Sequence, residues 1–105
     1  MKITELSPAE VQKALAAGKI TLIDVREPAE FKVGRIEGAY SMPLSTFDPT
    51  QLPSPTDRVV VFHCGVGRRS AMAIEKCAAA GVAHSTHLRG GLEAWLKAGL
   101  PTVSS

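Results

Sequence analysis

A run of apolar residues that leads straight into a cysteine and a short basic loop constrains this chain more than any other feature. Val59 to Phe62 form the run, and His63 and Cys64 follow it. The loop continues to Ser70 with two glycines and two arginines, and helix-forming residues extend from Ala71 to Ala80. This order is typical of a strand that turns tightly into a helix. The sequence therefore predicts that Cys64 lies at a strand end, beside a helix N-terminus.

The loop has the composition of an anion-binding turn. A thiol is nucleophilic as the thiolate, and a free cysteine ionises near pH ~8.5. Helix N-termini and cations lower that value, and Arg68 and Arg69 supply positive charge. Gly65 and Gly67 allow positive φ, which lets successive backbone N–H groups turn inward as an anion-binding nest. Cys64 is thus predicted to be a reactive thiolate, and Arg69 to have an anionic partner because its charge opposes the helix dipole.

Strand-like and helix-like segments alternate along the chain. This alternation predicts an α/β fold with a mainly parallel central sheet flanked by helices on both faces. A chain of 105 residues is expected to form a single domain, residues 1–105. The predicted helices are a capped helix from Ser7 to Gly18, a short turn Pro28–Val33, a helix Ser70–Ala80 and a last helix Gly91–Ala98. The predicted strands are Ile20–Val25, Ala39–Met42, Arg58–Phe62 and Ser85–Leu88, with a loop-rich middle around Pro43, Pro49, Pro53 and Pro55 and at most a turn at Leu44–Phe47.

Two strand ends are expected to form the site. Ligands bind beyond the carboxyl ends of the strands in such sheets. Cys64 follows one strand, and Asp24 and Arg26 close another. We expect Asp24 and Arg26 to support the loop, with Asp24 accepting hydrogen bonds from loop N–H groups or an arginine, because buried charges are normally paired.

The overall composition argues against several classes of partner. Hydrophobic residues make up 45% of the chain, charged residues 21%, and the net charge is +2. That charge is too small to indicate binding to nucleic acid or to a membrane surface. No apolar run approaches membrane-spanning length, and Met1 to Leu6 lack the apolar segment of a signal peptide. The expected location is cytoplasmic, without a structural disulfide.

The remaining cysteine and the histidines have less specific interpretations. Cys77 is either a resolving thiol or a small buried residue facing the sheet, and the second is favoured. The spacing of His63, His84 and His87 fits no standard metal-ligand pattern, so neither a metal nor an organic cofactor is expected. Alternation along the strand turns His63 away from Cys64, which favours a local hydrogen bond over a general-base role. Trp95 is expected to pack in the core.

Four motifs in order give the chain a resemblance to the single-domain rhodaneses, the thiosulfate sulfurtransferases. The family's loop reads Cys-x-x-Gly-x-Arg-Ser/Thr, and its first strand ends in Asp-Val-Arg. The matching residues here are Cys64, Gly67, Arg69 and Ser70; Asp24, Val25 and Arg26; Glu30, Phe31, Gly34, Ile36, Gly38, Ala39 and Pro43; and Gly90, Gly91, Trp95, Gly99 and Pro101. Arg35, Glu37 and Gly65 depart from the family pattern, and Gly65 removes a cation from the rim of the loop.

The resemblance implies a sulfurtransferase. Cys64 would take a sulfane sulfur from a small-molecule donor, thiosulfate or a low-molecular-weight persulfide, and hold it as a persulfide. A thiol, cyanide or a sulfur-carrier protein would then accept it. The implied substrate-binding residues are Gly65, Val66, Gly67, Arg68, Arg69 and Ser70.

Two alternatives stay open at the level of sequence. A Cys-based phosphatase or arsenate reductase uses a similar anion-binding loop, although the spacing from Cys64 to Arg69 is one residue shorter than in the phosphatase signature. No general acid is obvious from the sequence, and Asp48 of the middle loop stays open for that role. A non-catalytic rhodanese-like binding module is the other alternative, because fold alone does not imply function.

Overall fold

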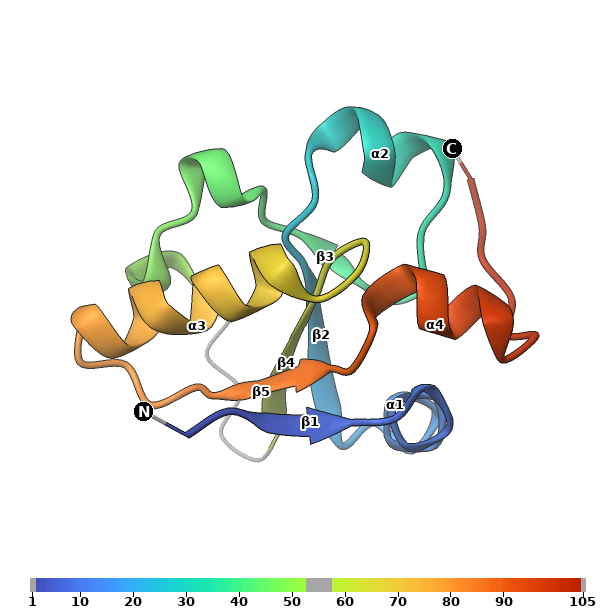
Figure 1. The fold of residues 1–105 in the computed structure, drawn as a ribbon, viewed down its shortest axis with the longest axis horizontal. Helices are drawn as coiled ribbons and strands as arrows, with labels where there is room; N and C mark the ends of the chain where they lie inside the picture. Colours follow the sequence, from blue (N-terminus) through green and yellow to red (C-terminus); the bar gives the residue numbers. More distant parts are fainter. Residues whose placement is uncertain (1, 53–57, 105) are drawn as a thin grey trace.

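A computed structural model describes residues 2–52 and 58–104. Its centre is a five-stranded sheet in the order β1-β5-β4-β2-β3, and every pairing between these strands is parallel (Figure 1). The strands are β1 (Thr4–Leu6), β2 (Ile20–Asp24), β3 (Tyr40–Ser41), β4 (Val59–His63) and β5 (Thr86–Leu88). The predicted parallel α/β fold is confirmed, with β4 as the central strand. Pro53 and Pro55, expected in the loop-rich middle, lie outside the described residues.

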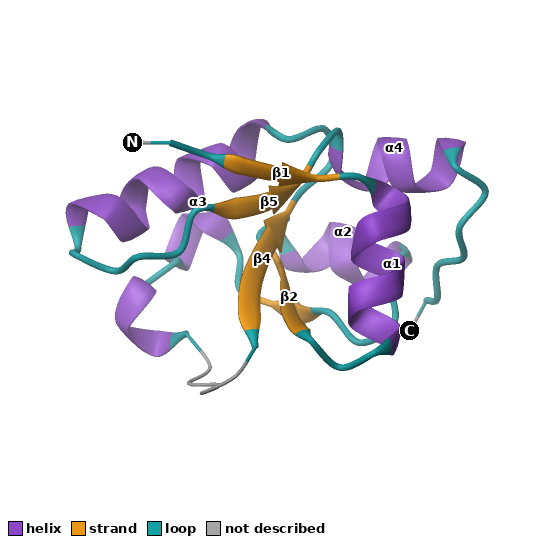
Figure 2. Ribbon diagram, turned by 90° about the horizontal axis from the view of Figure 1, so that it is seen from below, coloured by secondary structure: helices purple, strands orange, loops and turns teal. Residues whose placement is uncertain are grey.

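Helices cover both faces of this sheet, as predicted. In Figure 2, α3 lies on one side of the strands, and α1 and α4 lie on the other. The helical segments are α1 (Pro8–Ala16), α2 (Pro28–Val33), α3 (Arg68–Ala79), α4 (Gly91–Lys97) and two short 3₁₀ turns, η1 (Leu44–Thr46) and η2 (Pro49–Gln51). The capping box that starts α1 is present, with the Ser7 hydroxyl accepting from Glu10 N and Glu10 accepting from Ser7 N.

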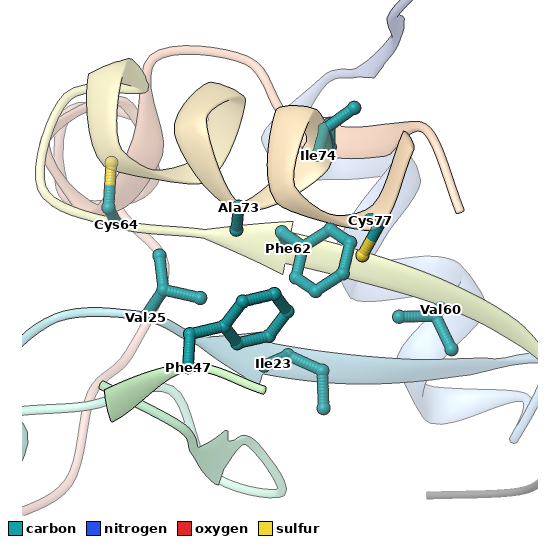
Figure 3. Packing of buried hydrophobic residues seen from close by; sticks show 9 residues of the cluster. All are labelled: Ile23, Val25, Phe47, Val60, Phe62, Cys64, Ala73, Ile74 and Cys77. Carbon is teal, nitrogen blue, oxygen red and sulfur yellow. The ribbon is translucent and has the colours of Figure 1, made fainter. Parts of the chain in front are cut away.

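Alternation along β4 divides its side chains between two cores. Val60, Phe62 and Cys64 belong to the core beneath α3, whereas Val61 belongs to the core shared with α1 and α4. Figure 3 shows the first of these cores, where Phe47 meets Phe62 edge to face with ring centroids 5.7 Å apart. Cys64 therefore faces α3, and the side chain of His63 points to the opposite face of the sheet.

The structure differs from the sequence-based expectation mainly at the element ends. α3 begins at Arg68, two residues before the predicted start, because Gly67 is its N-cap in a left-handed conformation, φ 113°. The strand expected over Ala39–Met42 is reduced to two residues. β1 was not predicted at all: three residues with one apolar side chain show no period, and pairing with β5 is what makes them a strand.

The parallel arrangement brings the candidate residues to one edge. β2 and β4 pair in register from Ile20 with Val59 to Asp24 with His63, so their carboxyl ends coincide. A further backbone hydrogen bond, from Val25 N to the carbonyl oxygen of His63 (2.9 Å), extends the pairing. Asp24 and the loop that carries Cys64 thus leave the sheet side by side.

Candidate active site around Cys64

Backbone amides converge on the sulfur of Cys64. Sγ accepts hydrogen bonds from Gly67 N (3.1 Å) and Ser70 N (3.4 Å), and it lies 3.8 Å from Ser70 Oγ. The residue is only 1% exposed, and Figure 3 shows its sulfur directed toward the first turn of α3. These N–H groups have no partner within the helix, because they belong to its first turn and to the turn before it. The loop is therefore built to hold a negatively charged sulfur.

The amides outweigh the effect of burial on the thiol. Burial acts on the Cys64 pKa most strongly and raises it, but hydrogen bonds from the N–H groups of Ser70, Gly67 and Val66 and from the Ser70 hydroxyl together leave the pKa below its ordinary value. The thiolate is stabilised chiefly by oriented dipoles at a helix N-terminus.

The two loop glycines have different tasks. Of the two positions where the sequence allows positive φ, Gly67 adopts it and Gly65 does not. A Cβ at position 65 would lie 3.3 Å from Nη2 of Arg69, which is tighter than ordinary contact. Glycine there leaves room for the arginine side chain.

Arg69 forms an ion pair with Glu30, apart from the backbone amides that contact the Cys64 sulfur. Its Nη1 and Nη2 donate to the two carboxylate oxygens of Glu30 on α2, at 2.6 and 3.0 Å. The Arg69 hydrogen bonds, acting against partial burial, hold the Glu30 pKa at about 2, and the Arg69 pKa is raised mainly by Glu30, with smaller contributions from Cys64 and Asp24. Glu30 is the anionic partner expected for Arg69. Its identity could not be read from sequence, because α2 and α3 are far apart along the chain. Arg68 is exposed at the start of α3.

Asp24 and Arg26 form a buried pair beneath the site. Asp24 accepts from Arg26 N at 2.9 Å and from the Arg26 guanidinium at 2.7 to 3.1 Å, and Arg26 Nη2 also donates to Gly34 O at 2.7 Å. These contacts tie the end of β2 to the chain after α2. Besides each other, the two side chains contact His63 and the backbone of Gly34. Their support of the loop that carries Cys64 stays a prediction.

His63 lies beside this pair on the face away from the sulfur. Its Nδ1 is 3.3 Å from Cys64 O, and its Nε2 is 3.4 Å from Oδ2 of Asp24. Complete burial lowers the His63 pKa and outweighs the opposing effect of Asp24, which favours the neutral ring. Nothing in this geometry brings the imidazole to the thiol.

The first turn of α4 supports the loop from behind, which sequence reasoning missed. Leu92 N donates to Cys64 O at 2.8 Å, and Glu93 N donates to Gly65 O at 3.0 Å. Gly91 allows this approach: its φ is 62°, and a Cβ there would come within 2.7 Å of the backbone of Gly65. These hydrogen bonds fix the carbonyl oxygens of Cys64 and Gly65 to α4. The pair of glycines at the start of α4, Gly90 and Gly91, was the available signal.

A second contact that the sequence did not indicate involves Ser70 and His87. Ser70 Oγ is 2.8 Å from Nδ1 of His87, and Nε2 of His87 is 3.0 Å from Oε2 of Glu5. Glu5 and His87 stand opposite each other on β1 and β5. Because β1 was not predicted, neither was this neighbourhood of the thiol.

The other singled-out residues lie in the core or away from the loop. Cys77 is fully buried in the core under α3, and burial raises the pKa of its thiol, which confirms the interpretation as a buried small residue. Trp95 is 2% exposed and donates from Nε1 to Pro101 O at 2.8 Å. Within residues 2–52 and 58–104, no group of three histidine, cysteine or carboxylate side chains is arranged to hold a metal ion. Among the helices of this described part, none is long and apolar enough to span a membrane.

The sequence matches a known protein family over most of its length. The family model described as the rhodanese-like domain matches residues 7–98. An uncharacterized protein of Synechocystis sp. is 42% identical over 100 residues, which cover 95% of this chain and 56% of that protein. A sulfurtransferase of Allochromatium vinosum is 33% identical over 103 residues, covering 97% of this chain and 96% of the relative.

Solved structures show the same architecture. A rhodanese-related protein of Thermoplasma volcanium superimposes with a TM-score of 0.80 at 27% identity, and the match covers 97% of this chain and 99% of that one. The two chains thus share the arrangement of strands and helices over 97% of this chain.

Proposed function

The chain belongs to the rhodanese-like family, and on that premise we propose that it is a sulfurtransferase that carries a sulfane sulfur on Cys64. Family membership and the relative named a sulfurtransferase support sulfur transfer in general. The observation that carries the proposal for this chain is the convergence of Gly67 N and Ser70 N on the Cys64 sulfur.

The proposed reaction has two displacement steps. The Cys64 thiolate attacks the sulfane sulfur of thiosulfate, the sulfur–sulfur bond breaks, and sulfite leaves with the bonding electrons. Cys64 then bears a persulfide whose outer sulfur is negatively charged, and the loop amides supply preorganised donors for that charge. An acceptor thiolate or cyanide attacks the outer sulfur in the second step, and the Cys64 thiolate is regenerated.

The arginines have separate parts in this proposal. Arg68 is exposed at the rim, where its charge attracts an anionic donor. Arg69 fixes the first turn of α3 to α2 through Glu30 and so keeps the amides in place. A low-molecular-weight persulfide serves as donor as readily as thiosulfate under this scheme, and a sulfur-carrier protein serves as an alternative acceptor.

Two observations weigh against the phosphatase alternative. A phosphatase needs its loop arginine on the phosphate oxygens, whereas Arg69 is paired with Glu30. It also needs a protonated general acid, whereas hydrogen bonds from the hydroxyl and N–H of Thr50 lower the pKa of Asp48. The lowered pKa of Cys64 weighs against a purely structural binding module, which has no use for a stabilised thiolate.

Intact mass spectrometry after incubation with thiosulfate tests the proposal. We expect a gain of one sulfur, about 32 Da, which cyanide removes with release of thiocyanate, as for a covalent intermediate on a nucleophile. Cys77→Ser is the matched control and should still gain the sulfur, whereas Cys64→Ser should not. A wild-type chain that gains no sulfur from thiosulfate or from a low-molecular-weight persulfide would contradict the proposal.

A further inference from the structure

A line of polar contacts connects Cys64 with the partly exposed side chain of Glu5 on β1. Cys64 Sγ is 3.8 Å from Ser70 Oγ, which is 2.8 Å from His87 Nδ1, and His87 Nε2 is 3.0 Å from Glu5 Oε2. Ser70 and His87 are buried, whereas the Glu5 side chain is 47% exposed. The sulfur-transfer scheme gives no part to either His87 or Glu5.

The sheet, rather than a surface loop, sets this geometry. Parallel pairing places Glu5 opposite His87, and His87 opposite Phe62 of β4. Gly67 lies beside the ring, since a Cβ there would be in ordinary contact with Cε1 of His87, at 4.0 Å. The imidazole is therefore held beside Ser70 by three neighbouring strands.

The Ser70 hydroxyl has one proton and three groups within reach. Besides Cys64 and His87, the carbonyl oxygen of Gly67 lies 3.1 Å away. A neutral His87 that donates from Nε2 to Glu5 carries no proton on Nδ1. Its Nδ1 then accepts a hydrogen bond from the Ser70 hydroxyl, whose one proton is directed at His87 and not at Cys64. A protonated His87 donates from both nitrogens, so the Ser70 hydroxyl is free to donate to the sulfur. The state of the imidazole thus sets the direction of the Ser70 hydroxyl.

We propose that His87, paired with Glu5, takes up the Cys64 thiol proton through Ser70, an inference that rests on the proposed role of Cys64 as the nucleophile. The S–H bond of Cys64 breaks and its proton moves to Ser70 Oγ, while the Ser70 hydroxyl proton moves to His87 Nδ1. The products are a thiolate, an unchanged serine and an imidazolium ion, so protons and electrons balance. His87 reaches the sulfur only through Ser70 and is a positioning residue.

The carboxylate of Glu5 orients the imidazole of His87. Glu5 Oε2 lies 3.0 Å from Nε2 and accepts its proton in a hydrogen bond, which leaves Nδ1 facing the Ser70 hydroxyl. Once Nδ1 has taken up a proton it donates to Ser70, and the Ser70 hydroxyl is free to donate to the thiolate. The hydrogen bonds place Glu5 of β1 and, through Ser70, Cys64 as the titratable groups around His87. Because Glu5 is half exposed, its contribution should be smaller than that of His87.

The pH profile of Cys64 alkylation by iodoacetamide, in a Cys77→Ser background, tests the relay. We expect His87→Phe to raise the alkylation midpoint by about one pH unit, which slows the reaction about tenfold near neutral pH and leaves the high-pH rate unchanged. Glu5→Gln should slow it about two- to threefold in the same range. His84→Asn, a partly exposed histidine elsewhere on the chain, is the matched control and should keep the original profile.

A double-substitution cycle isolates the path through Ser70. His87→Phe should have no further effect on the midpoint in a Ser70→Ala background, because the relay is then absent. The inference is overturned if the alkylation midpoint is unchanged in both Glu5→Gln and His87→Phe. It is also overturned if His87→Phe shifts the midpoint equally in the Ser70 chain and in the Ser70→Ala background. A rate lost uniformly at all pH values would also overturn it, since that is a packing effect. If His87→Phe does not fold, Glu5→Gln decides.

This readout needs no sulfur donor. A wild-type chain that forms no persulfide would therefore refute sulfur transfer, while the alkylation profiles would still decide whether Glu5 and His87 act on Cys64.

Discussion

At the scale of single residues, the thiolate of Cys64 depends on dipoles more than on cations. The N–H groups of Ser70 and Gly67 lower the pKa of Cys64 against the effect of burial, whereas the nearby Arg69 donates its hydrogen bonds to Glu30. Both arginines were expected from the sequence to act on the thiol directly. That expectation missed Glu30, because a partner 39 positions away cannot be found from the loop alone.

The ion pair between Glu30 and Arg69 should show a characteristic dependence on pH. The Glu30 pKa is held at about 2, below its ordinary value of 4.5, so the stabilising effect of the pair is complete above pH 4.5 and is lost as the pH falls from 4.5 toward 2. We expect Glu30→Gln to destabilise the chain by less than about 1 kcal/mol at pH 7, because both side chains are partly exposed.

Urea unfolding of wild type and Glu30→Gln from neutral to acidic pH measures this effect. The difference between the two should shrink steadily below pH 4.5. Glu37→Gln removes the same charge at an exposed position and is the control. A difference that stays constant down to the acid limit would mean that the pair does not hold the carboxylate ionised.

At the scale of elements, the loop is held between two helix N-termini. α3 directs amides at the sulfur, and α4 binds the carbonyl oxygens of Cys64 and Gly65. The sequence indicated the first helix, because the apolar strand, the glycines and the helix-forming run are contiguous. It also predicted the second helix, but not the contact of that helix with the loop, which depends on the path of the chain through β5.

The close approach of α4 makes Gly91 sensitive to substitution. We expect Gly91→Ala to destabilise the chain by more than about 2 kcal/mol, because a Cβ would combine an unfavourable positive φ with contact against the Gly65 backbone. It should also slow Cys64 alkylation by displacing the loop. Urea unfolding and alkylation rates measure the two effects.

Gly34→Ala is the control for that substitution. Gly34 has an extended backbone, φ −171°, and a Cβ there would meet nothing within 4 Å. Its stability should stay within about 0.5 kcal/mol of wild type. Equal effects at the two positions would show that α4 does not support the loop in the way described.

At the scale of the whole molecule, the parallel sheet brings segments from four parts of the chain to one thiol. The loop after β4, the start of α4 and the pair formed by β1 and β5 surround Cys64, and α2 anchors Arg69. Periodicity and turn residues predicted most strands and helices, the parallel arrangement and the position of Cys64. Side-chain pairs across the fold, such as Glu5 with His87, depend on strand order and on a strand too short to show a period, so they could not be predicted.

The measurement that tests the central claim most directly is the alkylation midpoint of Cys64 in the folded chain and in the same chain unfolded by urea. Cys77→Ser restricts the reaction to one thiol. The unfolded chain should titrate near the free-thiol value of about 8.5, and the folded chain clearly below it, because only the folded chain aligns the amides of Gly67 and Ser70 on the sulfur. Coinciding midpoints, or a higher midpoint in the folded chain, would show that burial outweighs the amides and would contradict the account.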